Sequence, residues 1–355
     1  MYALQRKNPL IDFFSDSIID QRAVNFWLKK INPLWSTDQM LGRIVHKQHV
    51  ADQTYSLTLL CNRHMDYGTA GQHHPVIVEI EGRRYERTYS LTQIAPNQVV
   101  LTVKKVEQGL VSSWLCDQAK IGDIVEFAQP YGDMRLPDAS QPLILLAAGS
   151  GITPMLSLLS FLDQTNQLKN YQIHLLYWAQ HATGLAFKDR FEVWQQQYPN
   201  FQFSAFCTRD EPAAARLNQQ HVDGLKDVAQ AQVLACGPSG FVQNAEQLFV
   251  HAKKFEAEAF SLTPMSFDDE GDVEIVLTKS QKILRVAKGQ PLLDALEQAN
   301  VKPVHGCRMG ICNKCACTKV SGVTKHVGNG SENAEPANLL RICVNSAKSD
   351  LVLDL

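Results

Sequence analysis

Residues 305–315 read His305-Gly306-Cys307-Arg308-Met309-Gly310-Ile311-Cys312-Asn313-Lys314-Cys315, and Cys343 follows after a long gap. The cysteine spacing, C-x4-C-x2-C and then a distant C, is one with which four thiolates bind a 2Fe–2S cluster. Gly306 and Gly310 let the loop curl tightly, because glycine adopts dihedral angles that other residues avoid. Structural zinc sites usually contain two C-x2-C pairs, and disulfide frameworks are typical of short secreted chains, so both alternatives fit less well. We therefore predict that the cluster ligands are Cys307, Cys312, Cys315 and Cys343.

The bulk properties are those of an ordinary protein of two or three domains. The chain has 355 residues and a formal net charge of −2, so no strong field draws it towards nucleic acid. The first residues lack the apolar core of a signal peptide, and the most apolar stretch, Leu143–Ala148, is far shorter than the roughly 20 residues that span a bilayer. The odd count of nine cysteines fits a reducing compartment. These features predict a cytoplasmic protein with no transmembrane segment and no nucleic-acid partner.

The hydrophobic pattern predicts an N-terminal helical extension over residues 1–40. Within it Val24, Trp27, Leu28 and Ile31 recur at the spacing of one helix face. From residue 41 to 137 the period changes to two, and short strands separated by turn residues predict a small antiparallel barrel. The six expected strands are 43–46, 54–60, 76–80, 85–90, 99–103 and 124–127.

Over residues 138–260 the chain alternates between strands and helices, which predicts a parallel sheet with crossover helices. The expected strands are 143–148, 173–178, 201–206 and 233–236. Residues 261–272 are proline-containing and acidic and are interpreted as a linker. The last segment, 273–355, is expected to contain two leading strands, a helix over Pro291–Asn300 and the cluster loop.

Two motifs predict a flavin site in the barrel. Arg87-Thr88-Tyr89-Ser90 ends a barrel strand, and at Gly109 a glycine turn opens a short helix. The N–H groups at a helix N-terminus suit a pyrophosphate, and Arg87 can add a bidentate cation. We expect Tyr89 to flank an isoalloxazine ring and Ser90 to donate to its reactive nitrogen. Taken alone, Arg87 would be a surface salt bridge and Tyr89 a core aromatic.

Two further motifs predict a nicotinamide dinucleotide site. Ala148-Gly149-Ser150-Gly151-Ile152-Thr153-Pro154 follows a buried strand and opens a helix, so its backbone can approach dinucleotide phosphates. Cys236-Gly237-Pro238 ends the fourth expected strand, where the alternative is a small buried thiol. The sequence contains no clear signal for specificity towards NADH or NADPH, so the nucleotide preference stays open.

Together these motifs resemble the ferredoxin–NADP reductase superfamily, and more narrowly its members with a flavin, a nicotinamide and a plant-type ferredoxin domain in that order. The resemblance covers nearly everything from Leu41 to Leu355. It implies an antiparallel β-barrel FAD domain, an α/β parallel-sheet NAD(P) domain and an α+β ferredoxin domain of the β-grasp type. The stretch Gly109–Ser112 is similar to the FAD-binding members rather than to the FMN-binding phthalate dioxygenase reductase group.

The resemblance also implies roles for single residues. In the family the threonine of G-x-G-I-x-P faces the nicotinamide, the cysteine of Cys-Gly-Pro lies beside the site of hydride transfer, and an E-x-F element follows the last strand. Carried over to this chain, the catalytic residues are Ser90, Thr153, Cys236 and Glu258. The cofactor-binding residues are Arg87, Thr88, Tyr89, Ser90, Gly109, Val111, Ser112, Gly149, Gly151, Ile152, Thr153, Pro154, Gly237, Pro238 and Phe260. No Ser-His-Asp set is evident in the sequence.

The three predicted cofactors have complementary chemistry. NAD(P)H delivers a hydride, which carries two electrons, whereas a 2Fe–2S cluster accepts one electron at a time. Flavin can do both, so FAD must lie between the other two. We therefore expect an oxidoreductase that moves electrons from NAD(P)H to FAD, then to the cluster and then to an acceptor.

The acceptor is suggested by the N-terminal extension. Residues 25–35 read Asn25-Phe26-Trp27-Leu28-Lys29-Lys30-Ile31-Asn32-Pro33-Leu34-Trp35, which resembles a segment of bacterial reductases that serve membrane-bound di-iron fatty acyl (stearoyl-CoA) desaturases. This implies electron transfer to such a desaturase, and a peripheral place at the inner membrane through it. The alternatives are a soluble Rieske or other oxygenase, or a redox-sensing regulatory subunit without steady turnover. The simpler alternative, which involves no partner, is that Trp27, Leu28 and Ile31 pack on this protein's own barrel.

Overall fold

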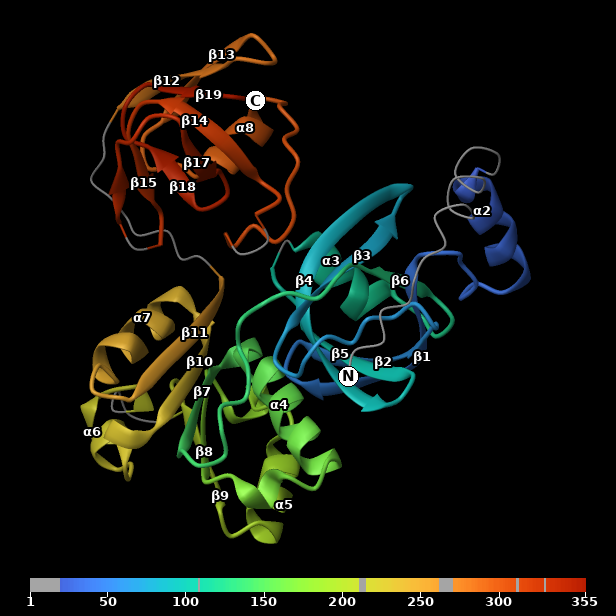
Figure 1. The fold of residues 1–355 in the computed structure, drawn as a ribbon, viewed down its shortest axis with the longest axis vertical. Coiled ribbons are helices and arrows are strands. Elements are labelled where there is room, and N and C mark those ends of the chain that lie inside the picture. Colours follow the sequence, from blue (N-terminus) through green and yellow to red (C-terminus); the bar gives the residue numbers. More distant parts are fainter. Residues whose placement is uncertain (1–19, 108, 211–214, 262–270, 311–312, 329) are drawn as a thin grey trace.

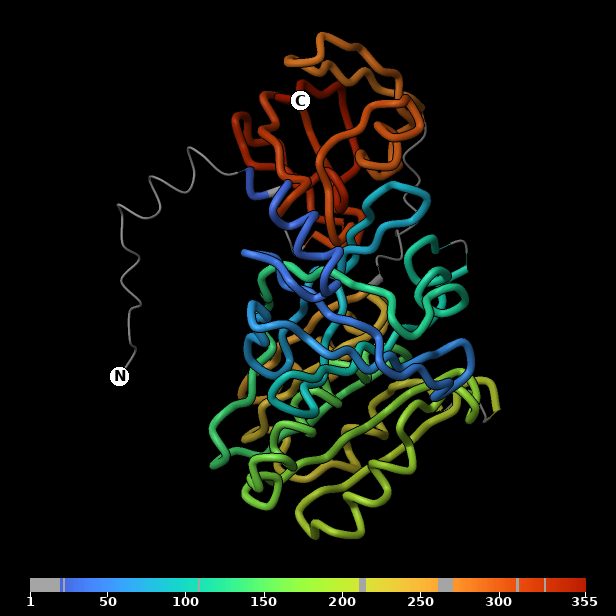
Figure 2. Tube along the Cα trace, turned by 90° about the vertical axis from the view of Figure 1, so that its right-hand side faces the viewer, coloured from blue at the N-terminus to red at the C-terminus, as the bar shows by residue number. Residues whose placement is uncertain are grey.

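Three structural units follow one another along the chain in the computed structural model (Figure 1), which describes residues 20–107, 109–210, 215–261, 271–310, 313–328 and 330–355. Figure 2 shows the C-terminal unit at one end of the long axis, the barrel in the middle and the parallel-sheet unit at the other end. Three predictions fall partly or wholly outside the described residues. They concern residues 1–19 of the extension, residues 262–270 of the linker and the ligand Cys312.

The first unit is a closed antiparallel barrel with the strand order β1-β2-β5-β4-β3-β6. Alternating side chains such as Leu57 and Leu59 point into its core and are fully buried. The prediction of six barrel strands is confirmed. They are β1 (Met40–Ala51), β2 (Thr54–Cys61), β3 (His73–Ile80), β4 (Arg83–Ala95), β5 (Gln98–Lys104) and β6 (Ile124–Phe127), and the short helix α3 (Leu110–Ser113) follows β5.

The second unit is a five-stranded parallel sheet with the order β11-β10-β7-β8-β9 and helices on its faces. Strand β7 buries all six of its residues, as expected for the centre of a parallel sheet covered on both faces. Its strands are β7 (Leu143–Ala148), β8 (Ile173–Ala179), β9 (Phe201–Cys207), β10 (Gln232–Pro238) and β11 (Lys254–Ser261). Its helices are α4 (Ile152–Gln164), α5 (Lys188–Gln197), α6 (Gln219–Asp223) and α7 (Ser239–Leu248).

One strand of this sheet differs from the sequence prediction. Glu258 and Phe260 were expected after the last strand, but both lie within the fifth strand, β11. This strand is at the edge of the sheet and pairs only with β10. Its sequence, KFEAEAFS, alternates charged and apolar residues and therefore lacks the continuous apolar run of a central parallel strand.

The C-terminal unit is a mixed sheet with the order β13-β12-β19-β14-β17, packed against one helix, and it carries a smaller three-stranded sheet, β16-β15-β18. The predicted helix over Pro291–Asn300 is confirmed as α8 (Leu292–Gln298), which buries four residues against the sheet. The strands are β12 (Asp272–Leu277), β13 (Lys282–Ala287), β14 (Ala316–Ser321), β15 (Thr324–His326), β16 (Glu332–Asn333), β17 (Asn338–Arg341), β18 (Asn345–Ala347) and β19 (Leu351–Leu353).

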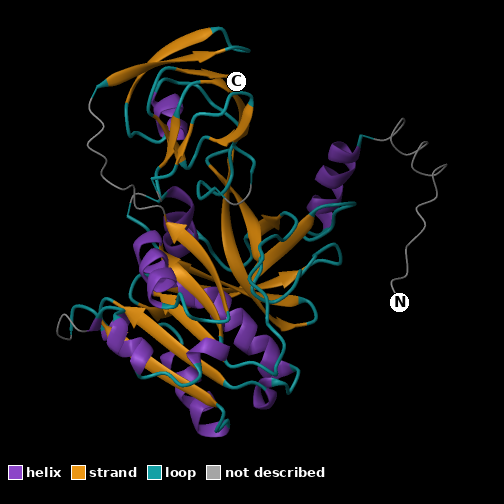
Figure 3. Ribbon diagram, turned by 60° about the vertical axis from the view of Figure 1, so that its left-hand side comes forward, coloured by secondary structure: helices purple, strands orange, loops and turns teal. Residues whose placement is uncertain are grey.

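The N-terminal helix α2 (Gln21–Ile31) stands away from the rest of the molecule beside the barrel (Figures 1 and 3). Val24 and Leu28 are half-buried, whereas Trp27 and Ile31 are exposed. The expectation that all three of Trp27, Leu28 and Ile31 pack on the barrel is therefore wrong for Trp27 and Ile31. Among the described residues, no helix combines the length and apolar character needed to cross a bilayer.

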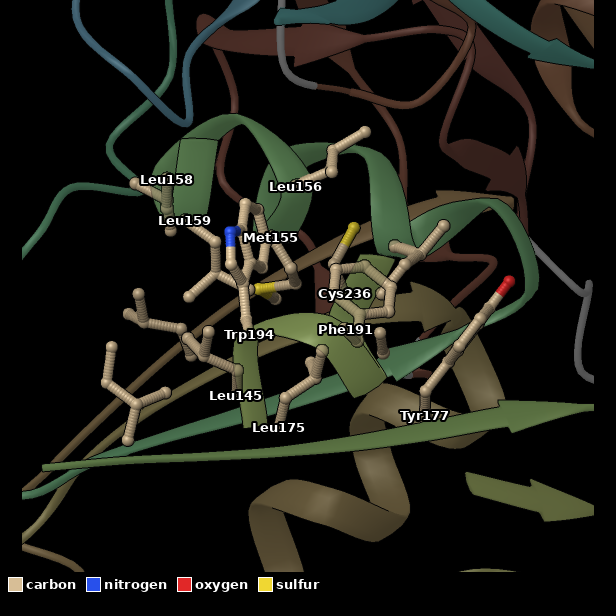
Figure 4. Packing of buried hydrophobic residues seen from close by; sticks show 14 of the residues in the cluster. Leu145, Met155, Leu156, Leu158, Leu159, Leu175, Tyr177, Phe191, Trp194 and Cys236 are labelled. Carbon is tan, nitrogen blue, oxygen red and sulfur yellow. The ribbon is translucent and has the colours of Figure 1, made fainter. Parts of the chain in front are cut away.

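Helix α4 joins the parallel-sheet unit to the barrel. The buried Ser157 of α4 donates a hydrogen bond of 2.8 Å to the backbone oxygen of Leu91 on β4, and Gln164 donates a second, also of 2.8 Å, to that of Gln93. On its other side α4 packs on the sheet, where Figure 4 shows Met155 and Leu159 together with side chains of α5 and of strands β7 and β8. This helix therefore fixes the carboxyl ends of the parallel strands against the barrel.

The turn between β7 and α4 depends on Gly151. A Cβ atom at this position would lie 2.1 Å from the backbone oxygen of Cys236, at the end of β10. Such a distance is far inside van der Waals contact, so only glycine allows the two loops to meet. The close approach places the start of α4 directly beside Cys236.

We predict that Gly151→Ala lowers the free energy of unfolding by about 1–3 kcal/mol or more, because the backbone of β10 must move. Gly240→Ala is the matched control, since a Cβ atom there would meet nothing within 4 Å. The control should be neutral or slightly stabilising because alanine is the better helix former. Urea-induced unfolding of the purified protein, followed by tryptophan fluorescence, measures both. Equal midpoints for Gly151→Ala and wild type would contradict this account.

Candidate active site at the junction of the three units

A cavity of about 440 Å³ opens where the three units meet. Its wall is formed by residues of β3, β4 and α3 from the barrel, of α4, β10 and β11 from the parallel-sheet unit, and of the cysteine loops from the C-terminal unit. The predicted site residues that line it are Arg87, Thr88, Tyr89, Ser90, Gly109, Val111, Ser112, Thr153, Pro154, Cys236, Glu258, Phe260, Cys307 and Cys343. Motifs scattered over the chain therefore converge on one space.

Arg87 places a cation in the wall of this cavity. Its guanidinium donates a 2.7 Å hydrogen bond to the backbone oxygen of Glu86. Within the described part of the chain, no carboxylate forms an ion pair with it. Burial, followed by the nearby Arg308 guanidinium, lowers the pKa of Arg87. A half-buried cation in this position is stabilised by an anion, so the residue fits the pyrophosphate of a dinucleotide such as FAD.

The glycine turn before α3 faces the same cavity. Ser112 Oγ accepts a hydrogen bond of 3.1 Å from the backbone N–H of Val106 and donates one of 3.2 Å to the oxygen of Gly109. A Cβ atom at Gly109 would lie 2.5 Å from Ser112 Oγ, so glycine is needed for this tight turn. Tyr89 packs against the barrel core, and burial raises the pKa of its phenol, which therefore stays neutral. Arg87–Ser90 were expected to end a barrel strand, but β4 continues to Ala95, so the motif lies in the middle of the strand. These features fit a flavin beside this part of β4.

Strand register brings the nicotinamide-side residues together. In the parallel sheet Cys236 pairs with Ala147 of β7 on one side and with Glu258 of β11 on the other. Thr153, at the start of α4, donates a 3.0 Å hydrogen bond to the backbone oxygen of Ser150. Burial, with a further contribution from the Glu258 carboxylate, raises the pKa of the Cys236 thiol. Cys236 is therefore an uncharged thiol at neutral pH rather than a nucleophilic thiolate.

His73 is the site residue that the motifs did not reveal. It lies on β3, opposite Ser90 in the antiparallel register with β4. Its Nδ1 is 2.9 Å from Ser90 Oγ, in a hydrogen bond, and its Nε2 contacts the Glu258 carboxylate. A continuous chain Ser90–His73–Glu258 thus connects the barrel to the parallel-sheet unit.

Gly132 makes room for this chain of side chains. It has a φ of +115°, and a Cβ atom there would lie 3.2 Å from Glu258 Oε1 and 3.4 Å from the ring of His73. Two backbone hydrogen bonds with Tyr131, of 2.8 and 2.9 Å, hold His73 in place from the same loop. The position of the ring is therefore fixed by the backbone as well as by its two polar partners.

Three of the four predicted cluster ligands can be placed. Cys307, Cys315 and Cys343 are all buried, and Cys315 Sγ lies 3.1 Å from Cys343 Sγ. The backbone N–H of Met309 donates to Cys307 Sγ at 3.3 Å, the kind of hydrogen bond that tunes cluster potentials. The hydrogen bond with Cys315, followed by burial, raises the pKa of Cys343, so its thiolate form requires a cation such as iron. Among the described residues, which do not include Cys312, no group of three metal-ligating side chains is gathered around one point, so the four-cysteine ligand set remains a prediction.

The loop that carries these cysteines is held by ion pairs on both sides. Arg308 pairs with Asp294 at 3.3 Å and also with Glu297, both of which belong to α8. Lys314 reaches across to the barrel, where its Nζ is 2.7 Å from Glu86 Oε1 on β4. Glu86 directly precedes Arg87, so this contact ties the cluster loop to the strand that carries the flavin motif.

Some predicted residues lie outside the shared cavity. Gly149 and Ile152 line a small neighbouring cavity together with Thr153, and Gly149 has a φ of +57°. Gly151, Gly237 and Pro238 are not among the residues that line the shared cavity, and Gly151 permits the close packing described above. Cys315 is also absent from the wall of the shared cavity, although its Sγ lies 3.1 Å from that of Cys343. The roles predicted for all these residues remain predictions.

Comparisons with known proteins agree with this three-unit arrangement. The profile of the oxidoreductase FAD-binding domain matches residues 42–136, that of the oxidoreductase NAD-binding domain matches 145–247, and that of the 2Fe–2S iron–sulfur cluster binding domain matches 275–346. The chain is thus an NAD(P)H-dependent oxidoreductase whose cofactors are FAD, NAD(P)H and a 2Fe–2S cluster.

Relatives and solved structures extend the similarity over most of the chain. An NADPH oxidoreductase of Mycobacterium tuberculosis is 31% identical over 93% of this chain and 88% of its own length. A glycine betaine monooxygenase reductase subunit of Chromohalobacter salexigens is 23% identical over 80% of this chain and 86% of its own. The structure of a phthalate dioxygenase reductase, described as modular for electron transfer from pyridine nucleotides to [2Fe–2S], superposes with a TM-score of 0.65 at 25% identity, covering 89% of this chain and 98% of its own.

We predict that His73→Phe slows the reduction of the bound flavin by NAD(P)H about tenfold or more. Ser90 and Glu258 each lose a partner, and 1.4 kcal/mol corresponds to a factor of about ten. Anaerobic stopped-flow absorbance of the flavin measures the rate. His174→Phe is the matched control, because His174 Nε2 makes a similar 3.0 Å bond to Ser204 Oγ outside the cavity. Equal rates in both variants and wild type would show that the Ser90–His73–Glu258 chain does not act on this step.

Proposed function

Because the chain belongs to the ferredoxin–NADP reductase superfamily, among the three-domain members of the phthalate dioxygenase reductase type, we propose that it supplies single electrons from NAD(P)H to an oxygen-activating acceptor protein. When bound, FAD would supply an acceptor for the hydride and the 2Fe–2S cluster would supply a one-electron outlet. The protein positions these groups, while the cofactors carry the chemistry.

The shared cavity is the observation that carries this proposal. Arg87 and Ser90 of the flavin motif, Cys236 of the nicotinamide side and the cluster residues Cys307 and Cys343 all line it. Groups bound at these residues are neighbours within one chain, so no separate carrier is needed between flavin and iron. A regulatory subunit without turnover would not require a nicotinamide site, a flavin site and a cluster around the same space.

We predict that Cys343→Ser removes the cluster and leaves the flavin half working. Iron and labile sulfide should fall from about two per chain to near zero, because three thiolates do not hold the cluster. Flavin reduction by NAD(P)H should persist, while cytochrome c reduction should fall at least tenfold. Cys317→Ser is the control, since Cys317 is a buried cysteine next to the loop and burial raises the pKa of its thiol to about 11. Wild-type iron content in Cys343→Ser would contradict the ligand assignment.

The acceptor class is supported by the names of relatives. The similar reductases reported above serve, by their names, a glycine betaine monooxygenase and a phthalate dioxygenase. An oxygenase component is therefore the acceptor class that the comparisons favour. Such an enzyme consumes electrons singly during oxygen activation, which matches a 2Fe–2S outlet.

A fatty acyl desaturase is a second and finer candidate. It rests on residues 25–35 alone, because neither of those two relatives is named as a desaturase partner. A desaturase is also an oxygen-activating enzyme that takes single electrons, so the two candidates share the same electron path. They differ in where the acceptor lies, since the desaturase of this class is bound to a membrane.

Deletion of the gene separates the two candidates. If the acceptor is a desaturase, the unsaturated fraction of cellular fatty acids should fall at least several-fold, and wild-type protein but not Cys343→Ser should restore it. An unchanged fatty-acid profile would exclude the desaturase as the main acceptor. The reductase proposal itself would fail only if the purified protein also reduced no one-electron acceptor with NAD(P)H.

A further inference from the structure

Helix α2 has its apolar residues on the outer face. Phe26, Trp27 and Ile31 are 55%, 68% and 72% exposed. Phe26 and Trp27 lie three or four residues from Ala23 and Lys30, which are also exposed, and Ile31 lies four residues from Trp27, so these five positions form one side of the helix. The ring centroids of Phe26 and Trp27 are 5.5 Å apart, and Lys30 Nζ lies 5.3 Å from the centroid of Phe26. We call these five residues the outer face of α2.

The inner face of the helix is held by polar contacts instead. Asn25 is buried, and its Nδ2 donates a hydrogen bond of 2.8 Å to Asp38 Oδ1. Its Oδ1 accepts hydrogen bonds from the backbone N–H of Thr37 at 2.8 Å and from Ser36 Oγ at 3.2 Å. These contacts with residues 36–38 fix the rotation of α2 about its axis. The hydrogen bonds of Asn25 therefore hold the helix in an orientation that leaves its outer face exposed.

The charge of the helix adds a second property. The sequence from Gln21 to Ile31 contains basic residues, including Lys29 and Lys30 in its last turn, and no acidic residue. Trp35, in the loop after the helix, is also 50% exposed. Lys30 lies within the outer face, and Lys29 lies outside it and is half-buried. Tryptophan, phenylalanine and isoleucine close to cations are typical of a helix that lies in the interface of a bilayer.

We propose that the outer face of α2 binds the surface of an anionic phospholipid bilayer. Trp27, Phe26 and Ile31 enter the headgroup region, and Lys29 and Lys30 interact with the lipid phosphates. The proposal goes beyond the electron-transfer function and does not depend on which acceptor is used. It places the reductase on a membrane surface.

The shape of the face favours lipid over a protein occupant. The outer face lies on one helix of 11 residues that stands beside the barrel (Figures 1 and 3), so the face is small and narrow. A stable protein–protein interface buries about 1,200–2,000 Å² in total, which usually requires a broad or grooved surface. Shallow insertion into a bilayer requires only a few large apolar side chains with nearby cations.

Co-sedimentation of the purified, cofactor-loaded chain with vesicles tests the proposal. The vesicles are either phosphatidylcholine alone or equal parts of phosphatidylcholine and phosphatidylglycerol. Wild type should bind the anionic vesicles. The double variant Trp27→Ser, Ile31→Ser should bind them about tenfold less, because two apolar side chains no longer leave water. The variant Lys29→Gln, Lys30→Gln should lose affinity for anionic vesicles only.

Val250→Ser is the matched control, since Val250 is 69% exposed in the parallel-sheet unit and lies outside this face. It should bind like wild type, and all variants should reduce cytochrome c at the wild-type rate in the absence of vesicles. Failure of wild type to bind anionic vesicles would overturn the proposal. A dimer that Trp27→Ser, Ile31→Ser dissociates would assign the face to a second copy, and binding that requires the acceptor in the vesicles would assign it to a protein. Either result would also overturn it.

Discussion

The meeting of three separately cored units at one cavity is the constraint on which the rest of the structure depends. The barrel and the C-terminal unit each enclose one apolar cluster, and the parallel sheet packs a cluster on each face. Electrons can move between groups bound to different units only if those units keep fixed positions relative to one another. The contacts of Ser157 with Leu91 and of Lys314 with Glu86 hold the other two units at two different points of β4. Strand β4, which carries the flavin motif, is thus bonded both to the parallel-sheet unit and to the C-terminal unit.

Electrostatics at the junction follow from the same arrangement. Arg308 is neutralised by the carboxylates of α8, whereas Arg87 keeps its charge for a ligand anion. Cys236 stays an uncharged thiol beside Glu258, and the raised pKa of Cys343 means that its thiolate form requires a metal cation. Each unit therefore contributes a different electrostatic environment to one cavity, which suits the different charges of pyrophosphate, nicotinamide and iron–sulfur groups.

Most of the fold could be predicted from periodicity, and most of the site from motifs. The barrel strands alternate with period two, and β7 is a continuous apolar run, so both were recognisable. His73 was not, because its partners Ser90 and Glu258 become neighbours only through the β3–β4 register and the edge strand β11. The sequence analysis did not predict strand β11, because its charged residues interrupt the apolar run that is typical of a parallel strand. The pattern of α2 predicted the helix, but not which residues share an exposed side, because Val24 and Leu28 of the predicted face are half-buried whereas Trp27 and Ile31 are exposed.

The central claim is that electrons pass from flavin to iron within one chain, across the shared cavity. Anaerobic stopped-flow mixing of the oxidised protein with NAD(P)H, observed at the cluster absorbance over a range of protein concentrations, tests it most directly. An intramolecular path predicts a first-order rate of cluster reduction that does not change with protein concentration. A rate that rises in proportion to protein concentration would mean that electrons travel between molecules, and would contradict the account.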